Sequence, residues 1–302
     1  KVFKTIAKDQ FITLNNFNEN NTVQNKFVFT SPNWGIPVRP HDVLMLDKIF
    51  NAPVYEFHVS YKDLDRNLPD EDWTCLYGKK ILVHAPELFE ESKLLNLCDT
   101  INIEKHIKNI NKVCSFCRLI QNKIGTDQTI IIITNIGGFS THEFKSEKEK
   151  TELYKLVKNN LKLIDETGCE ITIQNMAPFP WHFGGQRYQN IFAYPDEILS
   201  FCKETGRRIT LDTAHLSMHC MYQNEDFVKS IEKLSEITAH WHMSDAEGTN
   251  GEGVQMGKGD VNFKAVMSNV KESQTFIVET WQGHKDNGNG FAVDLKYLEE
   301  SK

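Results

Sequence analysis

Residues 211–216 read LDTAHL, and the pattern returns as HWHMSD at residues 240–245 and as TFIVETW at residues 275–281. Each stretch alternates in character and carries an acid or an imidazole near its carboxyl end. Such alternation is typical of a β-strand, whose successive side chains lie on opposite faces. Consecutive strands that deliver Asp, His and Glu from the same end predict a metal site at the mouth of a barrel.

Apolar, β-branched stretches alternate with longer helical patterns along the rest of the chain. The clearest strand, residues 129–134, contains four consecutive isoleucines, as expected for a strand buried on both faces of a parallel sheet. Eight strands are predicted, at residues 27–29 or 35–38, 54–59, 80–85, 129–134, 170–175, 208–213, 237–243 and 275–280. Helices are predicted at residues 103–120, 147–164 (with Gly168 as its C-terminal cap), 196–203, 225–234, 262–269 and 291–300.

This order of elements predicts a (β/α)8 TIM barrel in a single domain, residues 27–302. Strands alternating with helices imply right-handed parallel crossovers, and 302 residues suit one barrel. The competing fold is a doubly wound open sheet, but no G-x-G-x-x-G motif follows the first strand. Residues 1–26 include a polar run, NNFNENN at 15–21, and are predicted to be an irregular linker or the tail of a preceding domain.

Composition argues against several classes of protein. The net charge of −7 does not favour a general nucleic-acid binder, and no apolar run is long enough for a membrane span. Seven cysteines without disulfide spacing favour a reducing compartment, so we expect a cytoplasmic protein. Cys114 and Cys117 have C-x-x-C spacing, but they lie on the apolar face of a predicted helix and indicate core packing.

The predicted strand ends carry many polar side chains of the kinds that bind ligands and metals. In a TIM barrel the active site lies at the carboxyl ends of the strands. His240 precedes His242 by two residues, so we expect it one layer deeper, in the core or behind the site. His58 is either a site residue or an interior histidine bonded to Glu56. The strand-end residues are Glu56, His58, His84, Asn135, Gln174, Asn175, Asp212, His215, His242, Asp245 and Glu279.

Four motifs, DTAH at 212–215, HMSD at 242–245, MGKGDVNF at 256–263 and VET at 278–280, resemble successive signatures of the xylose isomerase-like TIM-barrel superfamily. That superfamily includes sugar and sugar-phosphate isomerases and epimerases and endonuclease IV-like nucleases. The resemblance, from about residue 35 onward, implies one divalent metal held by Glu, Asp, His and Glu. Asp212, His242 and Glu279 match three ligands, and Gln174 stands where the family has Glu. Gln can coordinate through its carbonyl oxygen but cannot act as a base.

The nuclease branch is a poorer match. Its members hold three zinc ions with nine ligands, and His84 and His215 match two further members of that set. Four ligands are replaced, by Asn135, Gln174, Gly253 and Gln255. We therefore expect no three-metal cluster and no cleavage of abasic-site DNA.

The leading hypothesis is a metal-dependent sugar or sugar-phosphate isomerase or epimerase. The predicted site holds either one divalent ion (Mn²⁺, Mg²⁺, Co²⁺ or Zn²⁺) or no metal. Its ligands would be Gln174, Asp212, His242 and Glu279. Candidates for the catalytic base are Glu279, His215 and His84. The residues expected to bind substrate are Arg39, Lys62 and Arg187, for a carboxylate or phosphate, and His58, Asn135, Trp181 and Asp245. Trp181 belongs to an aromatic loop, residues 179–183, that either closes over the ligand or packs across the barrel top.

A second, local resemblance concerns GIPVRPHD at 35–42, EFHVSYKDL at 56–64 and VHAPEL at 83–88. These stretches are similar to barrel modules fused to sialic-acid-type (nonulosonate) synthases. That implies a sugar-pathway context with a fused or adjacent synthase domain, and barrels of this type commonly form homodimers. The alternative function, motivated by Gln174, is a non-catalytic sugar-binding or regulatory barrel.

Overall fold

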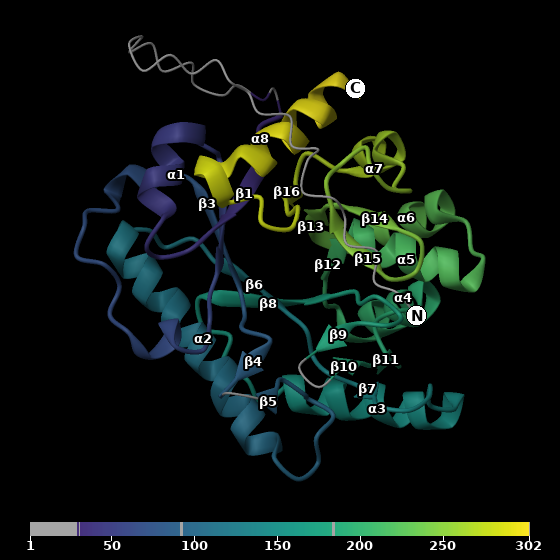
Figure 1. The fold of residues 1–302 in the computed structure, drawn as a ribbon. Coiled ribbons are helices and arrows are strands. Elements are labelled where there is room, and N and C mark those ends of the chain that lie inside the picture. The colour runs from purple at the N-terminus through teal and green to yellow at the C-terminus, as the bar shows by residue number, and fades with distance from the viewer. Residues whose placement is uncertain (1–28, 30, 91–92, 183–184, 302) are drawn as a thin grey trace.

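The structure, a computed structural model, describes residue 29 and residues 31–90, 93–182 and 185–301. The predicted linker at residues 1–26 lies outside this range, as does most of the alternative first strand at 27–29. Eight parallel strands close into a barrel in the cyclic order β1, β2, β3, β6, β8, β12, β13, β16. Helices surround this ring, and α8 packs beside α1 where the ring closes (Figure 1). The prediction of a TIM barrel is confirmed.

The barrel strands are β1 (Trp34–Val38), β2 (Val54–His58), β3 (Lys80–His84), β6 (Ile130–Thr134), β8 (Cys169–Gln174), β12 (Ile209–Asp212), β13 (Thr238–Met243) and β16 (Thr275–Val278). The helices are α1 (Val43–Phe50), α2 (Ile103–Ile124), α3 (Glu147–Leu161), α4 (Pro195–Thr205), α5 (Thr213–Gln223), α6 (Phe227–Ser235), α7 (Phe263–Asn269) and α8 (Lys285–Glu300). Short strands form hairpins and pairings at the loops: β4 (Leu88–Phe89), β5 (Lys93–Leu94), β7 (Phe139–Ser140), β9 (Trp181–His182), β10 (Gly185–Gln186), β11 (Tyr188–Gln189), β14 (Asp245–Glu247) and β15 (Gly251–Val254).

Side chains alternate between the helices and the barrel interior, as the pleat of a strand requires. Tyr55 and Phe57 of β2 belong to the large core beneath the helices. Val54, Leu82 and Ile133 form a separate, small apolar cluster. Since these three alternate with the outward residues, they face the barrel interior and form an apolar part of it.

Other parts of the barrel interior are polar. Thr172 of β8 and Thr210 of β12 are buried, and their hydroxyl oxygens lie 2.7 Å apart. Thr275 of β16 is also buried, and its hydroxyl lies 2.6 Å from Nδ1 of His240. Buried polar groups are retained where they bond to one another. This layer of threonines therefore supports the polar residues at the carboxyl ends of the strands.

The connection between β2 and β3 departs from the regular repeat. Residues 59–79 contain two short 3-10 turns, Asp63–Asp65 and Thr74–Leu76, and no α-helix. The fully buried Trp73 stacks on Phe57 of β2, with ring centroids 5.5 Å apart. A large aromatic side chain thus covers the part of the sheet that a helix would otherwise cover.

Helix α5, which the sequence did not predict, follows β12 without a connecting loop. Asp212 is its N-cap, and Oδ1 accepts a hydrogen bond from the backbone N–H of His215 at 2.9 Å. Buried side chains surround this helix on most sides, so it has no single apolar stripe. That explains why the helical period is absent from its sequence.

Two further predictions need correction. Helix α3 ends at Leu161 with Lys162 as its C-cap, so Gly168 does not cap it. Gly168 has a φ of 78° and forms the turn before β8 instead. The segment between β8 and α4, for which no strand was predicted, contains β9, β10 and β11.

The cysteine pair on α2 has the environment expected of core residues. Cys114 and Cys117 are both buried, and neither forms a disulfide. Across the described residues, no helix has the length and apolar character needed to cross a membrane.

Candidate functional site

A polar cavity of about 420 Å³ opens at the carboxyl ends of the barrel strands. Its lining combines histidines, carboxylates and one amide from five different strand ends. Those residues are His58, His84, Gln174, Asp212, His215 and Glu279. Six of the eleven strand-end residues singled out in the sequence therefore line one cavity, at the end of the barrel where this fold places its active sites.

Three of the four predicted metal ligands converge beside this cavity, which Asp212 and Glu279 line while His242 lies buried behind them. One potential ligand atom each from Asp212, His242 and Glu279 lies within 4.8 Å of the other two. Nδ1 of His242 lies 2.7 Å from Oε2 of Glu279. Two carboxylates and an imidazole form a mixed oxygen and nitrogen set that suits a divalent ion.

Gln174 lies beside this group and connects it to His84. Its amide nitrogen donates to Oδ2 of Asp212 at 2.9 Å and lies 3.3 Å from Nδ1 of His242. Its amide oxygen lies 3.2 Å from Nε2 of His84. The two ends of an amide have nearly the same shape and can exchange places. After such a rotation, the oxygen would face Asp212 and His242, and the nitrogen would donate to His84.

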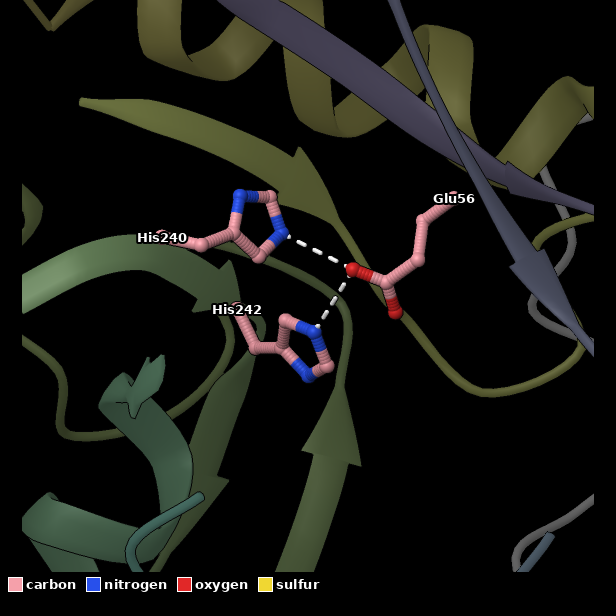
Figure 2. A group of neighbouring side chains, drawn as sticks. All are labelled: Glu56, His240 and His242. Atoms are coloured by element: carbon pink, nitrogen blue, oxygen red, sulfur yellow. Dashed lines mark hydrogen bonds and ion pairs between the residues drawn. The ribbon is translucent and has the colours of Figure 1, made fainter. Parts of the chain in front are cut away.

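His242 is held from behind by Glu56, a fully buried carboxylate on β2. Oε2 of Glu56 lies 3.0 Å from Nε2 of His242 and 2.9 Å from Nε2 of His240, so both imidazoles converge on one oxygen (Figure 2). The other oxygen lies 2.8 Å from Nε2 of His58. The hydrogen bond that the sequence allowed between His58 and Glu56 is therefore present, and His240 lies one layer deeper, as expected.

Glu56, His240 and His242 form a second group that could hold an ion. This inner group is completely buried, and the carboxylate oxygen already receives both imidazoles. A carboxylate behind a metal-binding histidine fixes its tautomer and orients the ring. We therefore assign Glu56 that supporting role. Since Glu56 accepts the Nε2 proton of His242, the Nδ1 lone pair is available to the outer group, Asp212 and Glu279.

The pKa values of the two carboxyl groups beside His242, those of Glu56 and Glu279, are both lowered, which favours their ionised forms. Burial opposes the charge on Glu56, but the charge of His242 and hydrogen bonds from three histidines hold its pKa well below the ordinary range. Burial likewise opposes the charge on Glu279, yet His242 lowers the pKa of Glu279 to about 2. Burial works against protonation of His242, but Glu279 and Glu56 raise its pKa well above the usual value. The two carboxylates thus stabilise positive charge at Nδ1, where a metal cation would compete with the proton.

His215, predicted as a candidate base, has an environment that favours its protonated form. Nδ1 lies 2.8 Å from the carbonyl oxygen of Asn175, and Nε2 lies 3.2 Å from Oε2 of Glu252. Burial lowers its pKa, but Asp212 and Glu252 outweigh that effect and raise it to about 10. An imidazole that donates from both nitrogens cannot accept a proton, so His215 is unsuited to the role of base.

Glu252 is a site residue that sequence reasoning missed. It lines the cavity from β15, in the segment between the predicted strand 237–243 and the predicted helix 262–269, for which no element was predicted. The β14–β15 hairpin brings its carboxylate to His215. An acidic residue between two glycines was the only signal in the sequence.

Asp245, predicted to bind substrate, supports a loop instead. Its side chain is 0% exposed. Oδ1 accepts hydrogen bonds from the backbone N–H groups of Ala246 and Val261, and Oδ2 accepts from those of Gly257 and Gly259, all at 2.9 Å. A Cβ at position 259 would lie 2.2 Å from the carbonyl oxygen of Ala246, so only glycine permits this close approach. The prediction of a substrate contact at Asp245 is wrong because the loop backbone surrounds the carboxylate.

The other predicted substrate residues lie at different distances from the cavity. Arg39 lines it, together with His58. Lys62 is exposed and lies over the ring of Tyr61, with Nζ 5.7 Å from the centroid. Asn135 does not line the polar cavity, but it donates to Oε1 of Glu87, which does, at 2.8 Å. Arg187 is also absent from the lining, and its backbone N–H bonds to the carbonyl oxygen of Pro180.

The aromatic loop divides between packing and exposure. Phe179 packs against Phe144, Tyr188 and Tyr222. For this residue, packing is therefore observed, which is one of the two roles that the sequence suggested for the loop. Trp181 is 59% exposed, and its Nε1 donates to Oδ1 of Asn250 at 3.0 Å. Phe183 lies outside the described residues.

Comparison with known proteins agrees with this architecture. The profile of a family described as xylose isomerase-like TIM barrel matches residues 57–301. An uncharacterised protein of Methanocaldococcus jannaschii is 27% identical over 175 residues, which is 57% of this chain and 62% of that relative. The chain therefore spans less than two thirds of the relative that it matches.

Several solved structures share the fold at low sequence identity. A D-tagatose 3-epimerase-like protein is 18% identical, with a TM-score of 0.60 over 89% of this chain and 98% of that one. A probable 3-DHS dehydratase of petrobactin synthesis from Bacillus anthracis is 15% identical, with a TM-score of 0.61 over 88% and 98%. A 3-keto-D-glucoside 4-epimerase from E. coli is 14% identical, with a TM-score of 0.59 over 89% and 99%.

The role assigned to Asp245 can be tested by replacement with asparagine. In Asp245→Asn, one oxygen that accepts two backbone N–H groups becomes an amide nitrogen that cannot accept. We expect the free energy of unfolding to fall by about 2–4 kcal/mol, since buried donors lose their acceptor. Urea denaturation measures the change.

Asp260→Asn is the matched control, because Oδ2 of Asp260 accepts a single, exposed bond from the backbone N–H of Gly248. We expect a loss under about 1 kcal/mol for this variant. Equal losses for the two substitutions would contradict the role assigned to Asp245.

Proposed function

The chain belongs to the xylose isomerase-like TIM barrel family, and from that premise we propose that it is a metal-dependent isomerase or epimerase acting on a sugar or sugar phosphate. The observation that carries the proposal is the convergence of Asp212, His242 and Glu279 beside a polar cavity that the two carboxylates line. The sugar epimerases among the structural neighbours support the same class of substrate.

The metal would lie on Asp212, Glu279 and Nδ1 of His242. Gln174 would contribute its amide oxygen after the rotation described above, while its nitrogen donates to His84. A divalent ion held there supplies Lewis acidity toward a carbonyl or hydroxyl oxygen of the substrate. Glu56 keeps the Nε2 proton of His242 in place and so orients the ring.

Proton transfer would use Glu279 and His84. Glu279 lines the cavity as a carboxylate, so in this proposal it removes a proton from the carbon next to a carbonyl, and the charge of His242, which lowers the pKa of Glu279, weakens it as a base. His84 stands across Gln174 from the metal ligands, with Nδ1 2.9 Å from the carbonyl oxygen of Ala85 and Nε2 facing the amide, so Nε2 must leave the amide to exchange a proton with a substrate. In this proposal, His84 exchanges the second proton, a role that the amide of Gln174 cannot perform. His215, held as a cation, would donate hydrogen bonds and balance the negative charge of Asp212.

Arg39 gives the cavity a candidate partner for an anionic group. Its Nη1 lies 3.9 Å from Oδ2 of Asp42, which is too far for a hydrogen bond between the guanidinium group and this carboxylate. His284 lines the same side of the cavity. An arginine in this position suits a phosphate or carboxylate on the substrate.

The wider context is also part of the proposal. The stretches at residues 35–42, 56–64 and 83–88 support a nonulosonate-type sugar and a fused or adjacent synthase domain. The free cysteines are consistent with a cytoplasmic setting. A homodimer is proposed by analogy with other barrels of this type. The second candidate function is a non-catalytic sugar-binding barrel, which the amide of Gln174 supports because it removes a titratable group from the site.

Metal analysis of the purified protein separates the two functions. We expect about one equivalent of divalent metal in the wild type and loss of nearly all of it in Asp212→Ala and in His242→Ala, because each substitution removes a ligand. Elemental analysis by mass spectrometry measures the content. His142→Ala, at an exposed histidine, is the matched control and should retain the metal. A metal-free wild type whose sugar binding ignores both substitutions would favour the non-catalytic barrel.

Gln174→Glu tests whether the amide occupies a ligand position. The new carboxylate would lie beside Oδ2 of Asp212, so like charges should lower the stability of the metal-free protein. A cation relieves that repulsion, and we expect metal affinity to rise by about tenfold or more, which is about 1.4 kcal/mol. Isothermal titration calorimetry with Mn²⁺ gives the affinity.

Gln174→Leu is the uncharged control and should bind Mn²⁺ more weakly than the wild type. Unchanged affinity in both variants would place the metal away from Gln174.

A further inference from the structure

A second cavity, of about 560 Å³, adjoins the polar one. The two share Val59, Pro86 and Glu87, which line both. The second cavity lies between the β4–β5 hairpin and β9, on the side of the barrel mouth that carries β2 and β3. The shared residues make it a lateral extension of the candidate active site.

The walls of the second cavity are mainly apolar. Leu88 and Leu94 come from the two strands of the β4–β5 hairpin, and Tyr61 and Trp181 supply aromatic rings. The indole N–H of Trp181 already donates to Asn250, so the ring needs no polar partner from a ligand. A 59% exposed indole beside two leucines provides a surface for an apolar group.

Glu87 marks the junction of the two cavities. Its Oε1 accepts a hydrogen bond from Nδ2 of Asn135, which fixes the carboxylate there. A carboxylate held in this way can accept a hydrogen bond from a hydroxyl group of a ligand that passes the junction. Asn135 would then act through Glu87, without touching the ligand itself.

We propose that the natural ligand has two parts, a sugar in the polar cavity and an aromatic substituent, linked to that sugar, in the second cavity. Each cavity alone falls within the roughly 300–1,000 Å³ range of small-molecule pockets. A free monosaccharide would use only the polar one and leave Trp181 and Tyr61 without a role. The identity of the first part rests on the proposed function, and the aromatic part rests on the second cavity.

Phenyl and methyl glycosides provide the probes. Matched pairs in the gluco, galacto and manno configurations, both anomers of each, carry no carbonyl group and so report binding without turnover. Isothermal titration calorimetry of the whole chain, with Mn²⁺ and again after chelation, gives the dissociation constants. For at least one configuration, we expect the phenyl glycoside to bind about tenfold or more tightly than its methyl counterpart, because the ring buries apolar surface.

Trp181→Ala should reduce this preference to about twofold or less. Trp281 is the matched control, because it lines only the polar cavity and is even more exposed, at 76%. Whatever Trp281→Ala does to absolute affinity, the ratio of phenyl to methyl binding should stay as in the wild type.

Three results would overturn the two-part ligand: equal binding of phenyl and methyl glycosides, a phenyl preference that survives Trp181→Ala, or no binding by any phenyl glycoside. If the wild type binds no Mn²⁺ and still prefers phenyl glycosides, that result would support the second cavity while contradicting the proposed enzyme. Stoichiometric metal with no phenyl preference would do the reverse.

Discussion

The carboxylate of Glu56 is the constraint on which the rest of the site depends. It is fully buried inside the barrel and bonds to His58, His240 and His242. A buried carboxylate is costly unless its partners compensate for the lost hydration. The three imidazoles provide that compensation, and in return their rings are oriented. The position of Nδ1 of His242, and therefore of the proposed metal, follows from this one interaction.

The layers of the barrel interior explain how such a group is tolerated. A small apolar cluster and the bonded threonines fill other parts of the barrel interior, and the cavity opens at the carboxyl ends of the strands. Asp212 fixes the opposite side by serving as the N-cap of α5 while its other oxygen faces Gln174. Asp245 accepts three backbone hydrogen bonds from the loop after β15 and a fourth from Ala246 of β14. Three buried carboxylates thus perform three different structural tasks, and only Asp212 lines the cavity.

Much of this could be predicted from the sequence. The order of strands followed from alternation and β-branched runs, and the strand ends that carry Asp212 and Glu279 followed from the barrel rule. The sequence failed where tertiary contacts decide the outcome. Helix α5 is buried on most sides and so lacks a period, and Glu252 reaches His215 only because a hairpin folds back. Asp245 looked like a ligand because its sequence position cannot show that loop backbone surrounds it.

The second cavity was likewise beyond the sequence. Tyr61, Leu88 and Trp181 belong to three separate connections, and only the closed barrel brings these together. The sequence predicted a ligand contact at Trp181, which stays a prediction, and it placed no boundary between the polar and apolar cavities.

The protonation of His242 tests the central account most directly. Nitrogen-15 NMR of the histidine side chains, with His242→Gln to assign the signals, reports which ring nitrogen carries hydrogen. We expect Nε2 to stay protonated, bonded to Glu56, before and after Zn²⁺ is added, while the Nδ1 signal alone shifts on addition. A metal-dependent shift at Nε2 with Nδ1 protonated would contradict the account, because Glu56 would then not set the face of His242 that meets the cavity.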